Sequence, residues 1–518
     1  MEKNPSYDQY LVSTGLGLIL VMAMTYIFAS LFMIVGGALN QAVARGILIA
    51  AIAVPSWLIC QTFPSRRDKA LVSVMIVAGL VLCTLISGVL MDTSIDGQAY
   101  HFHAVESLAS GWNPFHDSVP PLPHTDNMPP AIWVSHYPMG SWMVSAVGHA
   151  AGLPLESSKG LNLVVFAGSA LLTIGVLMRL GFGWITALLA GGLAAANPVT
   201  VGQLFTRMND GLMGSLILGL IMLAIMSIHL KDRRAMLYMV PVMILTLNLK
   251  FSAIPVLVAL CGYLCIAAWV LNGRNAALKT AGYLAAAGVI GIFAIGFAPY
   301  GNNILGYGHP FYPIMGPEGT RDIMTSNTPP FIEAMNPVQA FFYSLLAESH
   351  SGFGSMPSLK LPFALSAQEI RTSGGPDVRI GGFGPLFSGG LLLALIAGLV
   401  AAIRFRTNGT VRASLVVAVA LFVLALIFPE SWWARYVPYL WLVPLCVALA
   451  SIASPDHWQK IAGFAIIAVL GINAGLTTAA SLYLTHDRTS EAKAQIQAMK
   501  AAGGEYDIYF DLAFARSE

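Results

Sequence analysis

The chain has 518 residues, of which 56% are hydrophobic and only 10% are charged, and its formal net charge is +2. A soluble domain carries about 25% charged residues, so the composition excludes an ordinary soluble protein. No long basic run or low-complexity tail indicates nucleic-acid binding. The mean hydropathy of +0.71 and the many long apolar runs predict an all-α polytopic membrane protein.

The apolar runs predict about 13 transmembrane helices, because a helix needs about 20 apolar residues to cross a bilayer. The first run, residues 11–36, is too long for the core of a signal peptide, so we interpret it as a first span. The predicted spans are 10–35, 43–61, 70–91, 157–178, 183–199, 211–229, 235–249, 252–271, 280–299, 384–403, 411–429, 434–453 and 461–485.

Short basic loops predict the orientation of these spans, since lysine and arginine favour the cytoplasmic side. These loops are residues 65–69, Arg179, 231–234, 273–279 and 404–412. Alternation through the predicted spans places all of them on one face. The N-terminus is then expected to be cytoplasmic, and the tail 486–518 to be external.

Two long loops are expected on the external face, at 92–156 and 300–383. Loops of this length are usually functional or disordered, and their aromatic residues and Gly-Pro turns predict folded segments. The predicted division is a transmembrane module 1–299 that carries loop 92–156, an external region 300–383, helices 384–485 and an external tail 486–518.

The first of these loops gathers ionisable side chains in a chain that otherwise avoids them. Residues 94–118 read SIDGQAYHFHAVESLASGWNPFHDS, and Asp92 lies just ahead of them. Asp96 has two interpretations. Its carboxylate either caps the backbone N–H groups of a following helix or serves as a general base at the membrane surface. Asp92 competes for both roles.

The same segment predicts a short amphipathic helix from Asp96 to Ala109. Its apolar side chains Tyr100, Val105 and Leu108 are expected to face the membrane.

Histidines in this region raise the question of a metal. His101 and His103 are two residues apart and would point to different sides of a helix, and His136 is distant. No HExxH pattern is present, so a histidine-ligated zinc is disfavoured. A divalent ion held by Asp92 or Asp96 together with a phosphate stays open.

Several cations are predicted at the external ends of spans, where charge is costly unless it is paired or used. Arg207 either pairs with Asp210 or contributes to a site. Lys250 either snorkels to the interface or binds an anionic headgroup such as a phosphate. Arg435 has the same two interpretations as Lys250. It lies in an aromatic stretch that also contains Glu430.

The five cysteines are expected to be small core residues, because all lie in apolar segments. They are Cys60, Cys83, Cys261, Cys265 and Cys446. The Gly-, Pro- and aromatic-rich segment 306–319, which contains His309, cannot be a regular helix. It either lines a pocket for a sugar or lipid chain or forms a rigid turn on the membrane.

Taken in order, these segments resemble integral membrane glycosyltransferases of the GT-C fold, such as protein O-mannosyltransferases and the lipid A aminoarabinose transferase. DGQAY (96–100) with LASGWNPF (108–115) resembles their first external loop. HYPMGSW (136–142), HPFYP (309–313) and RYVPY (435–439) are similar to later family segments. The resemblance covers residues 90 to 455.

The resemblance implies a GT-C fold, a polyprenyl-phosphate sugar donor and inversion at the anomeric carbon. By position, Asp96 matches the catalytic acid or base, and Lys250 and Arg435 match places where the donor phosphate is held. The chain departs from the family at Gly97, where relatives often carry a second acidic residue.

The function expected from the sequence is therefore transfer of a sugar from a polyprenyl-phosphate carrier to a glycan, lipid or protein acceptor, on the external side of a bacterial inner membrane. Asp96 is the expected base, and Lys250, Arg207 and Arg435 are the expected phosphate ligands. The expected second line of the pocket is Asp92, Tyr100, His103, His136, Asp210, His309 and Glu430.

Two rival functions stay open. One is a transporter or flippase of lipid-linked glycans, which would place charges near the midplane and show internal repeats. The other is an O-antigen ligase or polymerase with a diphosphate donor, which would rely on paired arginines such as Arg371 and Arg379.

Overall fold

The computed structural model describes residues 5–117, 130–316 and 327–503. Within these ranges the chain is helical, and the only β-type pairing is two isolated bridges, Ala347 with Leu359 and His350 with Ile380. The chain divides into two compact units, and each is described by itself. Parts of both predicted loops, at 118–129 and 317–326, and the end of the tail, at 504–518, lie outside the described residues.

Unit 1 comprises residues 1–168, 204–326 and 485–518. Its helices are α1 (Tyr7–Ile34), α2 (Gln41–Cys60), α3 (Arg66–Ser87), α4 (Phe102–Ala109), α5 (Pro130–His136), α6 (Gly140–Ala150), the start of α7 (Leu161–Arg179), α10 (Asp210–Ile228), α11 (Arg234–Leu247), α12 (Ala253–Asn272), α13 (Arg274–Val289), α14 (Phe297–Tyr307) and the end of α22 (His457–Ala502).

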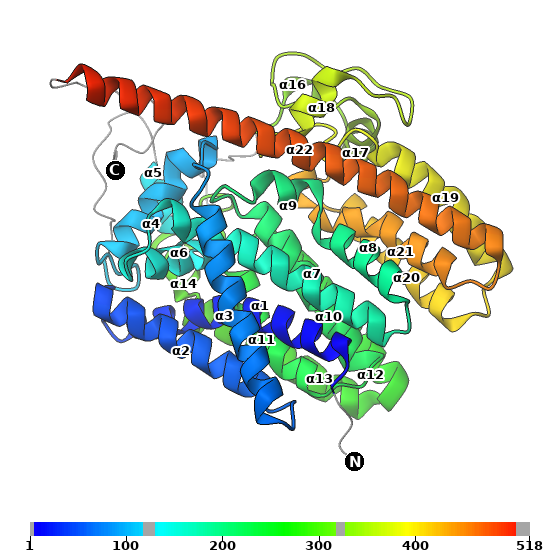
Figure 1. The fold of residues 1–518 in the computed structure, drawn as a ribbon, viewed down its shortest axis with the longest axis horizontal. Coiled ribbons are helices and arrows are strands. Elements are labelled where there is room, and N and C mark those ends of the chain that lie inside the picture. Colours follow the sequence, from blue (N-terminus) through cyan, green and yellow to red (C-terminus); the bar gives the residue numbers. More distant parts are fainter. Residues whose placement is uncertain (1–4, 118–129, 317–326, 504–518) are drawn as a thin grey trace. The chain divides into compact units, whose positions relative to one another are not determined.

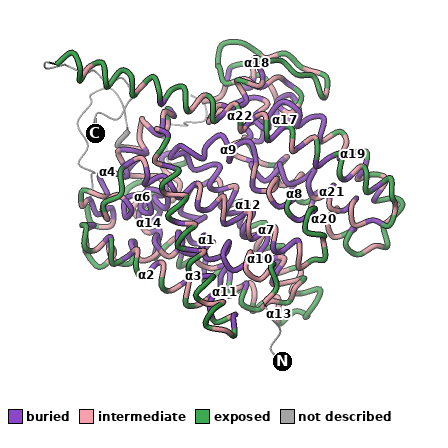
Figure 2. The backbone as a smooth tube through the Cα atoms, in the orientation of Figure 1, coloured by how far each residue is buried: buried purple, intermediate pink, exposed green. Residues whose placement is uncertain are grey.

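The core of unit 1 forms around α1, which packs against α2, α3, α6 and α11 (Figure 1). Small residues allow this close packing, as is common between membrane helices. A side chain on Gly168 of α7 would place its Cβ 2.9 Å from the carbonyl oxygen of Gly15 in α1. Figure 2 shows α1 and α10 as largely buried, whereas much of α2, α3 and α13 is exposed.

Unit 2 comprises residues 169–203 and 327–484. Its helices are the rest of α7, α8 (Trp184–Ala195), α9 (Pro198–Gln203), α16 (Pro330–Glu333), α17 (Pro337–Leu346), α18 (Ala367–Ser373), α19 (Phe387–Arg404), α20 (Gly409–Leu426), α21 (Leu442–Ile452) and most of α22.

The core of unit 2 lies where α21 packs against α19 and α20. Gly463 lets α22 approach α21 closely, because a Cβ there would lie 2.7 Å from the carbonyl oxygen of Ala448. The Trp441 indole donates a 2.7 Å hydrogen bond to the carbonyl of Leu193 and ties α8 to the segment before α21.

Ten helices of the described chain are long and apolar enough to cross a membrane, and each coincides with a predicted span. The other three predicted spans, 183–199, 235–249 and 434–453, correspond to shorter apolar helices, Trp184–Ala195, Arg234–Leu247 and Pro438–Ile452. The prediction of an all-helical chain with many membrane-type helices is therefore confirmed. That the three short helices also cross, and which face is cytoplasmic, stay predictions.

The C-terminal part of the chain differs in detail from the expected division. The last predicted span ends at 485, but α22 continues without a break to Ala502 and is 46 residues long. Residues 485–502 belong to unit 1. The described part of loop 300–383 is folded, since it contains α16, α17, α18 and the two bridges.

Candidate functional site

Asp92, just after α3, accepts hydrogen bonds from two separate segments of unit 1. It is only 1% exposed. The backbone N–H and the hydroxyl of Ser94 donate to its Oδ1 at 2.9 and 2.7 Å. The backbone N–H of Arg207 donates to its Oδ2 at 2.8 Å, and the guanidinium of Arg207 lies 3.8 Å from the same oxygen. Burial raises the pKa of Asp92, although the charge of Arg207 opposes this shift.

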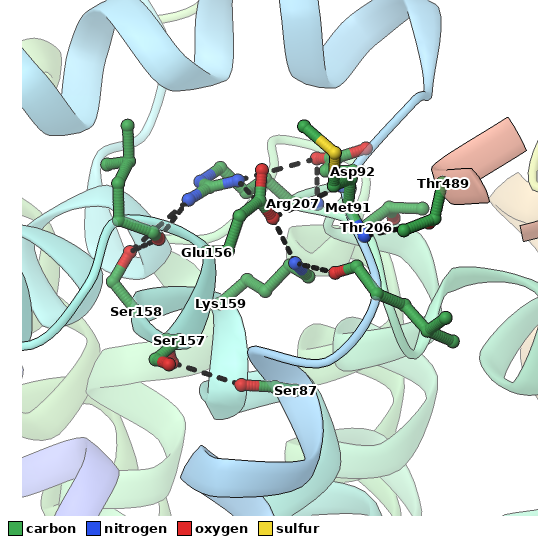
Figure 3. A network of polar contacts seen from close by, with 12 residues as sticks. Ser87, Met91, Asp92, Glu156, Ser157, Ser158, Lys159, Thr206, Arg207 and Thr489 are labelled. Atoms are coloured by element: carbon green, nitrogen blue, oxygen red, sulfur yellow. Dashed lines mark hydrogen bonds and ion pairs between the residues drawn. The ribbon is translucent and has the colours of Figure 1, made fainter. Parts of the chain in front are cut away.

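Glu156 and Lys159 extend this contact into a group of four charges (Figure 3), of which only Glu156 is partly exposed. The Lys159 ammonium donates to the carboxylate of Glu156 and, at 2.6 Å, to the carbonyl of Leu90. Glu156 accepts a 3.1 Å hydrogen bond from the N–H of Asp92 and lies 3.7 Å from the Arg207 guanidinium. We call Asp92, Glu156, Lys159 and Arg207 the ion cluster.

Sequence reasoning identified Asp92 and Arg207 but missed Glu156 and Lys159. A signal was present, because an acidic and a basic residue three positions apart lie on one face of a helical turn. The turn is Glu156–Gly160, directly before α7. Lys159 and Arg207 are two buried cations, and the carboxylates of Glu156 and Asp92 compensate their charge.

The end of α22 also contacts the segment that leads to Asp92. The hydroxyl of Thr489 accepts a 3.0 Å hydrogen bond from the N–H of Met91, and Thr489 is 3% exposed. The Lys493 ammonium lies 3.5 Å from the carbonyl of Val89. Residues 89–92 are therefore held on one side by the ion cluster and on another by α22.

Asp96 is half-buried at the start of a π-helical turn, Gly97–His101. Its carboxylate makes no capping hydrogen bond there, so the capping interpretation is not supported. Gln98 donates a 2.5 Å hydrogen bond to the carbonyl of Asp92, which links the turn to the ion cluster.

The structure gives a physical reason for Gly97. A Cβ at this position would lie 2.3 Å from Oδ2 of Asp92 and 2.5 Å from the hydroxyl of Ser94. An acidic side chain directly after Asp96 therefore does not fit here, because the carboxylate of Asp92 occupies that space.

The expected orientation of the first-loop helix is wrong. Val105 and Leu108 on α4 are 1% and 0% exposed, and α4 packs against α6. These side chains therefore face protein and not lipid, because α6 packs against α4. Tyr100 is half-buried and lies over the ring of His101, with ring centroids 4.3 Å apart. His103 is half-buried, and burial lowers its pKa.

Lys250 and Asp210 form a second buried ion pair in unit 1. The ammonium of Lys250 lies 2.5 Å from Oδ1 of Asp210, and the two residues are 8% and 1% exposed. The sequence alternatives were a snorkelling lysine and an Arg207–Asp210 pair. The structure instead pairs Asp210 with Lys250, and it brings Arg207 to Asp92 and Glu156.

His136 and the HPFYP turn lie side by side although they are far apart in the sequence. His136 shares a 2.7 Å hydrogen bond with Oδ1 of Asn303. Its ring meets those of Tyr307 and Tyr312 edge-on, at centroid distances of 4.9 and 5.0 Å. Burial lowers the pKa of His136, although Asn303 opposes the shift. The ring nitrogen Nδ1 of His309 accepts a 3.2 Å hydrogen bond from the N–H of Phe311 within the turn.

The other predicted site residues belong to unit 2, where a second group of charges forms. Arg435 lies 3.2 Å and Arg379 lies 3.6 Å from the carboxylate of Asp377. Both guanidiniums also lie over the ring of Trp433, at 5.1 and 4.2 Å from its centroid. Glu430 accepts a 2.8 Å hydrogen bond from the indole of Trp432.

The rival prediction of paired arginines named Arg371 and Arg379. Arg371 is exposed on α18, and the guanidinium that shares Asp377 with Arg379 is that of Arg435. The sequence did not single out Asp377, because a lone acidic residue in a long loop carries no pattern.

In the described ranges, no three His, Cys, Asp or Glu side chains gather in a way that could hold a metal ion. All five cysteines are free thiols. No known family model matches this chain, and no curated protein matches it.

Proposed function

We propose that this protein is a membrane glycosyltransferase of the GT-C type, with Asp96 as its general base. The observation that carries the proposal is the environment of Asp96. Asp96 is half-buried and lies four residues after Asp92, whose carboxylate contacts Arg207 in the ion cluster. Asp96 and Lys250 belong to the same unit. A base must be reachable by its substrate, and the half-buried position of Asp96 supports this role.

The proposed reaction transfers a sugar from a polyprenyl-phosphate carrier to an acceptor hydroxyl. The hydroxyl oxygen attacks the anomeric carbon while its proton passes to the carboxylate of Asp96. The bond between the anomeric carbon and the phosphate oxygen breaks, and the phosphate leaves as an anion. Attack from the face opposite the leaving group inverts the anomeric centre.

Cations stabilise the departing phosphate in this proposal, because preorganised positive charge lowers the energy of a developing anion. Lys250, which lies in the same unit as Asp96, is assigned this role. Arg207 is assigned a different role, since its guanidinium lies near two carboxylates, whereas the ammonium of Lys250 lies near one, that of Asp210. It holds the loop that carries Asp96. We place the reaction on the external face of a bacterial inner membrane.

The test is sugar transfer from a panel of polyprenyl-monophosphate and polyprenyl-diphosphate sugars to a panel of acceptors, for wild type and Asp96→Asn. Wild type should form product from a monophosphate donor, and Asp96→Asn should lose at least about two orders of magnitude in rate. The matched control is Glu106→Gln, since Glu106 lies on the same loop and pairs with His149 at 3.4 Å. It should retain transfer.

Three outcomes would count against the proposal. Equal rates for Asp96→Asn and wild type would remove Asp96 from the chemistry. Product from diphosphate donors alone would favour the ligase or polymerase alternative. Movement of a lipid-linked glycan across a vesicle membrane without a covalent product would favour the flippase. Parallel reactions with EDTA decide whether a divalent ion takes part.

A further inference from the structure

Beside the ion cluster, unit 1 contains a small cavity that the proposed reaction does not use. Ser141, Trp142 and Ser145 of α6 line it together with Lys159 and Arg207. It has room for about one particle the size of a water molecule. The proposal below is independent of the glycosyltransferase assignment.

The walls of the cavity carry positive charge without a carboxylate among them. Lys159 and Arg207 are 1% and 4% exposed. Their partners Asp92 and Glu156 contact them from outside the lining. Because the side chains of Lys159 and Arg207 are both buried, their charges are screened less than charges at the protein surface.

A buried hydroxyl also lines this space. Ser141 is 5% exposed, and its Oγ has no hydrogen-bond partner in the described structure. Buried polar groups nearly always have a partner, so this hydroxyl points to an occupant. Ser145 lies one helical turn further along the same face of α6.

The donors on the cavity wall favour an occupant that only accepts hydrogen bonds. An ammonium has three protons, and the carbonyl of Leu90 and the carboxylate of Glu156 take two of those of Lys159. The hydroxyls of Ser141 and Ser145 can each donate one more. We propose that the cavity binds one small monoatomic anion of the chloride class.

The charge of the ion cluster is compatible with an added anion. Its two cations line the cavity, whereas its two carboxylates do not. An anion in the cavity would therefore lie nearer to Lys159 and Arg207 than to Asp92 and Glu156.

The first test follows thermal unfolding of the full-length protein in detergent while chloride replaces gluconate at constant ionic strength. We expect the unfolding midpoint to rise with chloride and to saturate, because a ligand that binds only the folded state stabilises it by mass action. Bromide should act in the same way. Midpoints that are equal in gluconate and chloride would overturn the proposal.

The variant that tests the site is Ser141→Ala, which should raise the chloride concentration at half-saturation severalfold. The matched control is Ser388→Ala in unit 2. Ser388 is also 5% exposed and its hydroxyl also has no partner, but it does not line this cavity. Ser388→Ala should reach half-saturation at the same chloride concentration as wild type. Equal half-saturation concentrations for Ser141→Ala and Ser388→Ala would contradict the proposed site.

A direct observation covers the case in which Ser141→Ala does not fold. Crystals of the wild-type protein grown in bromide should give an anomalous scattering peak between Lys159, Arg207 and Ser141. Ordinary water density without anomalous signal at this position would overturn the proposal.

Discussion

The backbone N–H of Arg207 donates a 2.8 Å hydrogen bond to the carboxylate of Asp92, a residue 115 positions earlier in the chain. This contact joins the segment before α10 to the loop after α3, and both residues are buried. The guanidinium of Arg207 adds a charge contact with the same carboxylate.

Arg207→Met should destabilise the protein by about 3–5 kcal/mol, because it leaves the buried Asp92 carboxylate and the partly exposed Glu156 with one cation fewer. Thermal or denaturant unfolding in detergent measures the loss. Arg404→Met is the control, since Arg404 is exposed in the last turn of α19, and it should change stability by less than about 0.5 kcal/mol. Similar values for the two variants would show that the ion cluster is not stabilising.

Gly97→Ala should destabilise the first loop by about 1–3 kcal/mol, because the new methyl group overlaps Asp92 and Ser94. Hydrogen exchange of the amides in residues 92–101 would show the loosening directly. Gly306→Ala is the matched control, since a Cβ at Gly306 would meet nothing within 4 Å. If Gly97→Ala leaves exchange unchanged, the packing of Asp92 against Gly97 is not tight.

Lys250→Met should destabilise unit 1, because the Asp210 carboxylate stays buried without its ammonium partner. The double variant Lys250→Met with Asp210→Asn should recover most of that stability. If Lys250 also binds the donor phosphate, the double variant should still lack sugar transfer. A double variant that regains both stability and transfer would show that Lys250 pairs with Asp210 but does not bind the donor phosphate.

The raised pKa of Asp92 predicts a pH dependence of stability with a definite sign. The folded state binds the Asp92 proton more tightly than the unfolded state, whose reference pKa is 3.8. The stability of wild type relative to Asp92→Asn should therefore be highest below pH 3.8 and should fall as the pH rises through the folded pKa.

The measurement is the difference in unfolding midpoint between wild type and Asp92→Asn at a series of pH values. Asp487→Asn provides the control, since Asp487 is exposed on α22, and it should track wild type. A difference that grows in favour of wild type with rising pH would mean that the cations of the cluster outweigh burial.

The helices of this protein could be predicted from its sequence with good accuracy. All thirteen predicted spans coincide with apolar helices, and ten of these are long enough to cross a membrane. The physical reason is local. A backbone in hydrocarbon must satisfy its own hydrogen bonds, which requires long, continuous apolar helices that composition alone reveals.

The sequence was also sufficient to identify the segment around Asp92 and Asp96 as unusual, because charge is costly at the end of a membrane span unless it is paired or used. It could not assign the partners. Arg207 was considered with Asp210, three residues away, but the structure pairs Asp210 with Lys250 and brings Arg207 to Asp92 and Glu156. Val105 and Leu108 were expected to face lipid, and α6 covers them instead.

The sequence by itself thus determined the helices, their approximate limits and the loop in which buried charge accumulates. Only the tertiary structure decided which charges meet, why a side chain at residue 97 is unfavourable, and that the end of α22 contacts the loop before Asp92. Helix formation depends on neighbours within a few residues, whereas the hydrogen bonds from Asp92 to Glu156 and from Met91 to Thr489 span 64 and 398 positions. Such pairs are set by how helices pack, and a single sequence carries no direct record of that packing.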